Sequence, residues 1–148
     1  MLTILTKSFS ELSTKELYDI LQLRAEVFVV EQNCVYQDID GKDEKALHVI
    51  GFKKDKIVAY CRIFKPGDYF EKASIGRVVV AQKERKFGYG HVIFQNSMDA
   101  VETYFKETSI KISAQLYLKK FYESHGFVQV GEGYLEDDIP HIAMIKNQ

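Results

Sequence analysis

One segment in the second half of the chain restricts the possible folds more than any other. It runs from Val78 to His91 with the sequence VVVAQKERKFGYGH, so an unbroken apolar run leads into a basic turn that contains two glycines. Consecutive valines are typical of a strand that is buried on both faces of a sheet. The following residues, from Tyr89 to about Lys106, carry apolar side chains at helical spacing. A buried strand that leads through a turn into a helix indicates an α/β fold.

The turn between this strand and this helix has the features of an anion-binding site. The first N–H groups of a helix have no partner within the helix, and the helix dipole adds positive charge there. Gly88 and Gly90 remove side chains that would block a phosphate group. Positive charge is added by Lys83, Arg85 and Lys86. The spacing matches neither the G-x-G-x-x-G dinucleotide motif nor the G-x-x-x-x-G-K-[ST] loop. An ordinary strand-to-helix connection is the alternative interpretation of the glycines alone.

The remaining elements complete a mixed pattern in one domain, residues 1–148. Apolar residues at helical spacing predict a first helix that begins after Ser13 or Thr14 and ends near residues 31–33. Strands are expected at 2–6, 47–52, 57–64, 73–81, 110–114, 127–130 and 142–145, and a short helix at 116–124. The polar stretches 36–45 and 132–140 are expected to be loops. This order predicts an α/β fold with a central mixed sheet flanked by helices.

Composition excludes several classes of protein. Of the 148 residues, 46% are hydrophobic, which argues for a packed core and against disorder. The 20 basic and 21 acidic residues leave a net charge of −1, so we expect no nucleic-acid or membrane partner. No apolar run reaches the length of a membrane span. Cys34 and Cys61 are too few for a disulfide framework and lack metal-ligand spacing, which favours reduced thiols, a cytoplasmic location and no bound metal.

Several motifs in the expected order resemble the GNAT superfamily of N-acetyltransferases. Arg85–Gly90 (RKFGYG) matches its [QR]-x-x-G-x-[GA] signature, in the expected place after a valine-rich strand. Phe121–Phe127 (FYESHGF) is similar to the Y-x-x-x-G-F segment that ends the next helix. The segments Leu23–Asp43, Ile75–Val80 and Leu135–Met144 are similar to the ElaA-like branch of this superfamily. The resemblance covers nearly the whole chain and implies the GNAT fold.

The resemblance also implies a reaction and a set of site residues. The family transfers an acetyl group from acetyl-CoA to an amine by direct attack in a ternary complex. The turn that would hold the pyrophosphate consists of Arg85, Lys86, Phe87, Gly88, Tyr89 and Gly90. Backbone N–H groups of a bulged strand, here Val78, Val79 and Val80, are implied to hold the pantetheine arm and the thioester carbonyl. Tyr122 matches the usual proton donor to the leaving sulfur, although the residues around it also fit a core tyrosine. Gln115 stands where many relatives have an asparagine that contacts the cofactor.

No residue stands out as the general base that accepts a proton from the amine. His48 is our candidate, because alternation along its strand allows it to face the cleft; a structural histidine is the alternative. Glu31, Asp38, Asp40 and Asp43 are further candidates in the loop region, where solvated charge is the alternative.

Two arginines interrupt apolar patterns. Arg24 lies in the apolar stripe of the first helix, and Arg77 is expected to face the same way as Ile75 and Val79. A buried charge is costly unless it is paired, so we expect both to form buried ion pairs.

The expected partner is a small-molecule or peptide amine. The acidic residues Glu136, Asp137 and Asp138 could attract a cationic acceptor, and a solvated acidic turn is the alternative. The oligomeric state is open, with a homodimer as one option. Two other functions use the same turn. A non-catalytic acyl-CoA-binding regulatory module would keep Arg85–Gly90 without needing Tyr122, and a nucleotide-binding protein would bind ATP in place of CoA.

Overall fold

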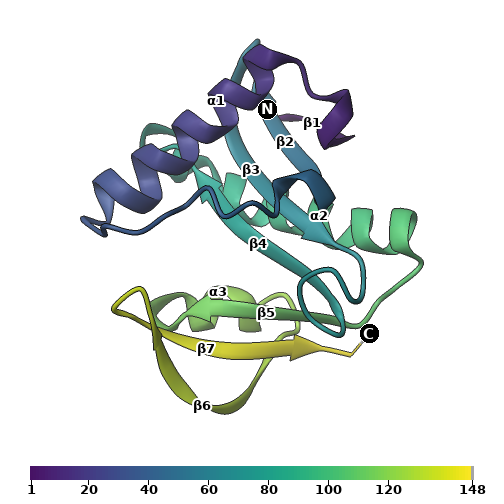
Figure 1. Ribbon diagram of the computed structural model, residues 1–148, viewed down its shortest axis with the longest axis vertical. Helices are drawn as coiled ribbons and strands as arrows, with labels where there is room; N and C mark the ends of the chain where they lie inside the picture. The colour runs from purple at the N-terminus through teal and green to yellow at the C-terminus, as the bar shows by residue number, and fades with distance from the viewer. Residues whose placement is uncertain (148) are drawn as a thin grey trace.

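Seven strands form a single mixed sheet in the computed structural model, which describes residues 1–147 (Figure 1). The strands are β1 (Thr3–Ser8), β2 (Leu47–Lys53), β3 (Lys56–Phe64), β4 (Ala73–Val80), β5 (Ile110–Gln115), β6 (Val128–Glu136) and β7 (Ile139–Lys146). Their order across the sheet is β1-β2-β3-β4-β5-β7-β6, and only the pair of β4 and β5 is parallel. The expected α/β fold with a mixed sheet is confirmed.

Helices cover both faces of this sheet. They are α1 (Thr14–Arg24), its continuation as the π-helix η2 (Ala25–Glu31), α2 (Tyr89–Phe105) and α3 (Lys119–Glu123), with 3-10 turns η1 (Phe9–Glu11), η3 (Asp43–Lys45), η4 (Gln82–Phe87) and η5 (Leu116–Leu118). Helix α1 with η2 packs on one face, and α2 with α3 packs on the other (Figure 1). Within residues 1–147, no helix is both long and apolar enough to cross a membrane.

Local sequence explains where α1 begins. The Ser13 hydroxyl accepts a hydrogen bond from the Glu16 N–H at 3.0 Å, and the Ser13 N–H donates to the Glu16 carboxylate at 2.9 Å. This reciprocal pair is a capping box, so Ser13 is the N-cap and Thr14 is the first helical residue. The helical conformation continues through η2 to Glu31, as the apolar spacing predicts.

Two apolar clusters attach the helices to the sheet. One joins Ile93 of α2 and Tyr122 of α3 to one face, and the other joins Ile20 of α1 and Phe28 of η2 to the opposite face. Burying one large apolar side chain contributes about 1.5–3 kcal/mol. The two clusters therefore hold both helical layers firmly on either side of the central strands.

The two central strands pair over only a short distance. Ala73 pairs with Ile110 and Ser74 with Lys111, and the described residues of β4 and β5 form no further pairs with each other. Beyond this point the strands diverge, as Figure 1 shows. The inner edges of β4 and β5 therefore present backbone groups that the sheet itself does not use.

A β-bulge lies in β4 where the strands diverge. The pairing of β3 with β4 shifts between Tyr60 and Arg62, and Arg77 adopts a φ of 52°. The bulge reverses the facing of the side chains: Ile75 packs in the cluster beneath α2, whereas Val79 packs beneath α1. The expectation that Arg77 faces the same way as both residues is wrong, because simple alternation does not continue through a bulge.

The polar segment 36–45 is a loop that ends in η3, as expected, but two of its aspartates are buried. Asp38 and Asp43 are each 7% exposed, and both accept hydrogen bonds from the fully buried Arg24 guanidinium at 2.8 Å. The ion pair expected for Arg24 is confirmed. Burial alone would raise the pKa of the Asp43 carboxyl, but the hydrogen bonds and charges of Arg24 and Arg62 outweigh it and lower this pKa.

Two more arginines extend this ionic cluster. Arg62 donates to Asp40 at 2.6 Å and to Asp43 at 2.9 Å. Arg77 lies 2.7 Å from the Asp38 carboxylate, which confirms its expected ion pair. The three arginines and three aspartates balance in charge and fix the polar segment across β3 and β4. These carboxylates hold the fold together, so they are not free bases.

The C-terminal hairpin is longer than predicted. β6 extends to Glu136 and β7 begins at Ile139, so only Asp137 and Asp138 form the turn, with φ values of 52° and 63°. The prediction of a loop over residues 132–140 is wrong at both ends, because β6 occupies its first part and β7 its last. Most of β6 is exposed to solvent, so its sequence carries little of the apolar pattern by which strands are recognised.

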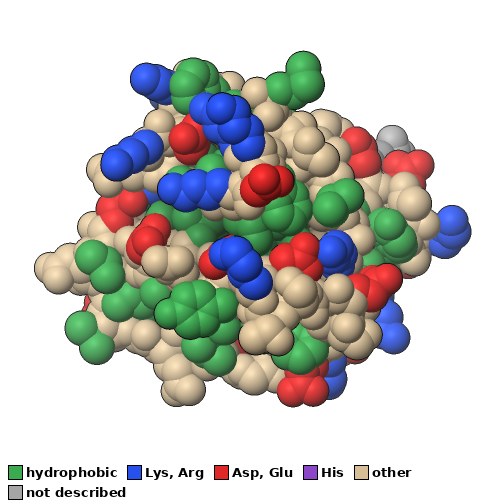
Figure 2. All heavy atoms as spheres, turned by 90° about the horizontal axis from the view of Figure 1, so that it is seen from above, with side chains coloured by type: hydrophobic (Ala, Val, Ile, Leu, Met, Phe, Trp, Pro, Cys, Tyr) green, Lys and Arg blue, Asp and Glu red, His purple; other side chains and the backbone are tan. Residues whose placement is uncertain are grey.

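Charges of both signs are interspersed on the surface. On the face shown in Figure 2, lysine and arginine side chains lie among aspartate and glutamate side chains and apolar groups. A mixed arrangement of this kind agrees with the net charge of −1. This face does not present a broad field of one sign to a polyelectrolyte.

Arg24→Met should destabilise the protein by about 3–5 kcal/mol, because it leaves buried aspartates without their partner. Urea unfolding followed by circular dichroism measures this loss. Lys15→Met is the matched control, since the Lys15–Asp19 pair is exposed and contributes only about 0.3–0.5 kcal/mol. Equal, small losses for both variants would contradict a structural role for the ionic cluster.

Candidate functional site

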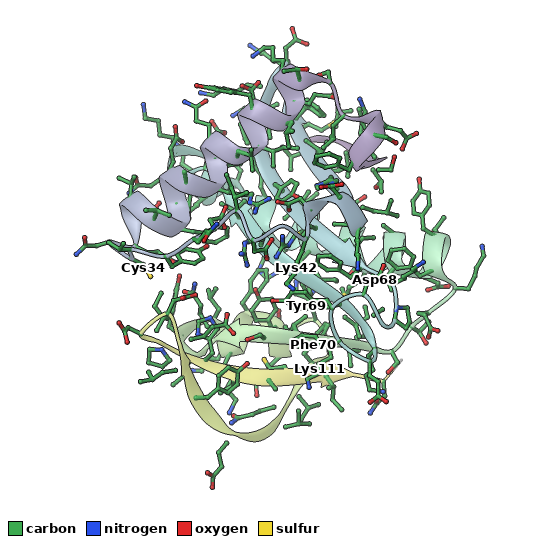
Figure 3. The ribbon with its side chains drawn as sticks, viewed as in Figure 1. Cys34, Lys42, Asp68, Tyr69, Phe70 and Lys111 are labelled. Atoms are coloured by element: carbon green, nitrogen blue, oxygen red, sulfur yellow. The ribbon has the colours of Figure 1, made fainter. Side chains whose placement is uncertain are left out.

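A pocket of about 470 Å³ lies where β4 and β5 diverge. Its walls come from η2, the bulged part of β4, the turn Arg85–Gly90 (here called the phosphate turn), β5, the segment 115–122 and the β6–β7 hairpin. Figure 3 shows Cys34, just after η2, near the tip of this hairpin. The Cys34 thiol donates to the Asp137 carbonyl at 3.4 Å, so the two sides of the pocket meet at this point.

The phosphate turn forms one end of the pocket. Gly88 precedes the first residue of α2 with a φ of 74°, which an L side chain rarely adopts. A Cβ atom placed on Gly88 would meet nothing within 4 Å, so the space above this glycine is open. The first N–H groups of the 17-residue helix α2 lie beside this space. The geometry therefore fits an anion such as a pyrophosphate.

Arg85 connects the phosphate turn to η2. Its terminal nitrogens donate to the Glu31 carboxylate at 2.5 and 2.7 Å, and its Nε donates to the Val80 carbonyl at 3.1 Å. Glu31, considered above as a general base, is thus ion-paired at the phosphate end of the pocket. The bridge joins the two walls of this end.

The pocket gathers most of the predicted cofactor residues. Those that line it are Val78, Val79, Val80, Arg85, Gly88, Gly90, Gln115 and Tyr122. Three residues of the turn do not line the pocket. Lys86 and Phe87 point away, with the Lys53 ammonium 4.4 Å from the Phe87 ring, and the Tyr89 hydroxyl accepts a hydrogen bond from the N-terminal amine at 3.2 Å.

Tyr122 lines the middle of the pocket from α3. Its ring packs at 5.2 Å from that of Phe94, and within residues 1–147 its hydroxyl has no hydrogen-bond partner. Burial, followed by the charges of Cys61 and Tyr117, raises the pKa of this phenol. The hydroxyl is therefore protonated at neutral pH and free to donate into the pocket.

Gln115 ends β5 at the same level. Its side-chain amide exchanges hydrogen bonds with the amide of Gln32 at 3.2 and 3.3 Å. The two glutamines thus form a polar contact between β5 and the segment after η2. A contact of Gln115 with the cofactor would have to share these groups.

His48 does not lie in the pocket. It is fully buried, its Nδ1 is 2.6 Å from the Tyr60 hydroxyl, and its Nε2 is 3.0 Å from the Asp43 carbonyl. Burial lowers the pKa of His48. The expectation that His48 faces the cleft is wrong, because its side of β2 is covered by the polar segment 36–45. Nε2 contacts that segment and Nδ1 contacts β3, so both ring nitrogens are already used.

The end of the pocket opposite the phosphate turn is lined by polar groups of β5, β6 and β7. The Ser113 hydroxyl lies 2.5 Å from the Tyr134 hydroxyl and donates to the Glu136 carboxylate at 3.2 Å. The His141 ring lies 3.6 Å from the same carboxylate. Sequence reasoning named Glu136 but missed His141 and Ser113. Strand alternation from Gln115 could have placed Ser113 on this face, whereas no periodic signal marks His141.

Neither cysteine is placed to act as a nucleophile. Burial raises the pKa of the Cys61 thiol to about 12, and this thiol lies in the core beneath α2. Cys34 lines the pocket but its thiol is directed to a backbone carbonyl. Within residues 1–147, no group of three or more His, Cys, Asp or Glu side chains could hold a metal ion.

Comparison with known proteins agrees with this architecture. Residues 10–148 match the family model of the acetyltransferase (GNAT) domain. The chain is 45% identical to the protein ElaA of Escherichia coli over 139 residues, which is 93% of this chain and 91% of that protein. An acyl-CoA N-acyltransferase from Pseudomonas aeruginosa superposes with a TM-score of 0.93 at 41% identity, covering 99% of both chains.

A more distant structure shares the fold alone. An aminoglycoside 6′-N-acetyltransferase complexed with coenzyme A superposes with a TM-score of 0.72 at 16% identity, covering 96% of each chain. The family model and the ElaA relative each span most of the chain and are independent of the pocket geometry. The chain therefore belongs to the GNAT superfamily of acyltransferases, in the branch that includes ElaA.

Proposed function

We propose that the protein transfers an acetyl group from acetyl-CoA to a primary amine, by direct attack of the amine within a ternary complex. The observation that carries this proposal is the single pocket of about 470 Å³, which reaches from the phosphate turn past Tyr122 to Glu136 and His141. A donor bound at one end and an acceptor at the other would share one space. Direct transfer requires that arrangement.

The residues present fit the donor. The open space over Gly88 and the N-terminus of α2 would take the pyrophosphate. The free edge of β4 at Val78–Val80 would bind the pantetheine amides and the thioester carbonyl, which is the electrophile that acetyl-CoA supplies. A solved structure of the same fold is complexed with coenzyme A, which supports CoA as the donor that this pocket would hold.

Tyr122 would protonate the leaving sulfur. Its hydroxyl has no partner within residues 1–147, and its side chain lines the pocket from α3 together with the edge of β4, where the thioester would sit. The raised pKa keeps the proton on the phenol until the C–S bond breaks. Hydrogen bonding or proton transfer to the thiolate then favours its departure.

The acceptor would be a cationic amine. Glu136 and Asp137 line the end of the pocket opposite the phosphate turn, which we call the acceptor end. The nearby Arg77 is neutralised by Asp38. The local charge therefore attracts an ammonium group. Polyamines, amino sugars and peptide amines are the classes to be tested.

Wild-type protein with acetyl-CoA and a panel of these amines should release free thiol, read with a chromogenic disulfide. CoA should raise the melting temperature by ligand linkage, and ATP at equal concentration should raise it much less. Equal shifts by ATP and CoA would indicate a nucleotide-binding protein. CoA binding without thiol release from any amine would favour a non-catalytic acyl-CoA-binding module.

Gly90→Val should weaken CoA binding about tenfold or more while preserving the fold. A Cβ at this position would lie 3.5 Å from Phe121, which is ordinary contact, but the γ-methyl groups would extend into the pocket. Gly90→Ala is the matched control and should bind normally. Calorimetry gives the affinity and circular dichroism the fold.

Gly88 is a less informative position for this test, because its positive φ would strain any substituted residue. Parallel loss of fold and binding in Gly90→Val would refute this role.

Tyr122→Phe should lower kcat by about 100-fold, the lower end of general acid catalysis, with little change in CoA affinity. The ring remains, so its packing on Phe94 survives. Tyr104→Phe removes an exposed hydroxyl from α2 outside the pocket and serves as the control. Single-turnover thiol release with a panel amine measures the effect. Full activity of Tyr122→Phe would leave water as the proton source.

A further inference from the structure

The four histidines of the chain differ in what their ring nitrogens contact. Both nitrogens of His48 are used in the buried ionic region. His91 and His125 contact each other, with Nδ1 of one 2.9 Å from Nε2 of the other. His141 has one nitrogen hydrogen-bonded and the other free of any hydrogen bond within residues 1–147. His91 and His125 each keep a second nitrogen without a hydrogen bond within residues 1–147, but His91 lies beside Gly90 at the phosphate turn and His125 does not line the pocket. Among the described residues, His141 is the histidine that places such a nitrogen at the opposite end of the pocket.

The position of His141 in β7 directs its side chain toward the acceptor end. Its strand neighbours across the sheet are Gln115 of β5 and Tyr134 of β6, and its ring stacks on that of Tyr134 at 6.2 Å. The adjacent Ile142 points to the opposite face, into the core beneath α2. His141 lines the pocket although it is only 7% exposed, so its ring is held in place by its surroundings.

The hydrogen bond of His141 decides which nitrogen can accept a proton. Nδ1 lies 2.7 Å from the Ile139 carbonyl oxygen. A carbonyl oxygen only accepts, so in the neutral ring the proton is on Nδ1, which donates it. Nε2 is then left with a lone pair. The Glu136 carboxylate lies 3.6 Å from Nε2, close enough to stabilise a positive charge on the ring.

We propose that His141 is the general base that removes a proton from the acceptor ammonium group, and that Glu136 stabilises the resulting imidazolium. This inference rests on the proposed function and assigns a residue to its missing step. Imidazole exchanges protons near neutral pH, which suits a base that must neutralise an alkylammonium. The Glu136 side chain is 45% exposed and lies 3.6 Å from the His141 ring, which places its negative charge beside the imidazolium that forms.

The protons balance over one turnover. The ammonium gives one proton to His141 Nε2, and the neutral amine attacks the thioester carbonyl carbon. The C–N bond forms and the C–S bond breaks. The attacking nitrogen loses its second proton to solvent while the sulfur gains one from Tyr122, which is reprotonated by solvent. The imidazolium releases its proton to water past the exposed Glu136, so acetyl-CoA and an ammonium yield an amide, CoA and one proton.

Several other charged or titratable groups line this part of the pocket. From β6 and its turn they are Glu136 and Asp137; from β4, Arg77; and from the segment after η2, Cys34 and Tyr36. Tyr134 lies behind them and contacts the Ser113 hydroxyl. Ser113 and Gln115 of β5 do not titrate. Arg77 is paired with Asp38, and the Tyr36 hydroxyl donates to the same carboxylate at 2.8 Å. Glu136 and Asp137 therefore dominate the electrostatics around the His141 ring.

The decisive experiment is the pH dependence of thiol release by the wild type and by His141→Gln, with the panel amine that reacts fastest. The wild type should lose kcat/KM as the pH falls and the imidazole is protonated. His141→Gln should be about 100-fold slower at pH 7 and should recover as the pH rises and the amine loses its own proton. CoA affinity should not change. If His141→Gln shows the same fall of kcat/KM toward low pH as the wild type, the assignment is overturned.

Glu136→Gln tests the second half of the proposal. Without the carboxylate the imidazolium that forms during turnover is less stable, so kcat/KM should fall and its pH profile should differ from that of the wild type. Asp138→Asn is the matched control: it removes one negative charge two residues away, lies outside the pocket, and asparagine tolerates its φ of 63°. Identical profiles for Glu136→Gln and the wild type would exclude the stabilising role.

A readout that needs no acceptor separates this inference from the proposed function. Nitrogen-15 NMR of histidine-labelled protein, assigned with His141→Gln, should show the proton of the neutral His141 ring on Nδ1. A proton on Nε2 would overturn the inference whatever the activity. Wild-type protein that binds CoA but releases no thiol with any panel amine would instead overturn the proposed function, and the base role with it.

Discussion

The divergence of β4 from β5 is the constraint on which the rest of the molecule depends. Two parallel strands that pair only at Ala73–Ser74 leave an interior edge in the middle of a sheet. Buried backbone groups need partners, so such an edge is stable only where solvent or a ligand reaches it. The bulge at Arg77 shifts the register with β3, and beyond it Val79 and Val80 pair with β3 along one edge while their other edge faces the gap toward β5. The pocket follows directly from strands that cannot continue to pair.

The ionic cluster is what allows a pocket to persist on one face of this sheet. The segment 36–45 crosses β3 and β4 with only the short turn η3 as regular structure, and the ionic cluster of six charged side chains holds it there. Removal of one member of a buried set is costly because the remaining charges lose their partners. The cluster also neutralises Arg77, which lines the acceptor end of the pocket. The charge that remains there belongs to Glu136 and Asp137.

Much of the fold could be predicted from local sequence, and the candidate site only in part. The valine run, the glycine turn and the apolar stripe of α2 are contiguous signals, so the phosphate end of the pocket was predictable. The facing of Arg77 was not, because a bulge inserts a residue without any mark in the sequence. His48 was misplaced for a similar reason: its cover comes from a distant segment through ion pairs. His141 gains its surroundings from β5 and β6, which pairing alone brings together.

The Arg85–Glu31 bridge has a consequence for the energetics of any anion at the phosphate turn. Arg85 already uses its Nε for the Val80 carbonyl and its terminal nitrogens for a carboxylate of the same chain. A phosphate that engages this guanidinium displaces one ion pair to form another. The net gain is the difference between two screened attractions, so ionic strength weakens both sides of the exchange together. Affinity at this turn is then set chiefly by backbone N–H groups, which added salt cannot neutralise.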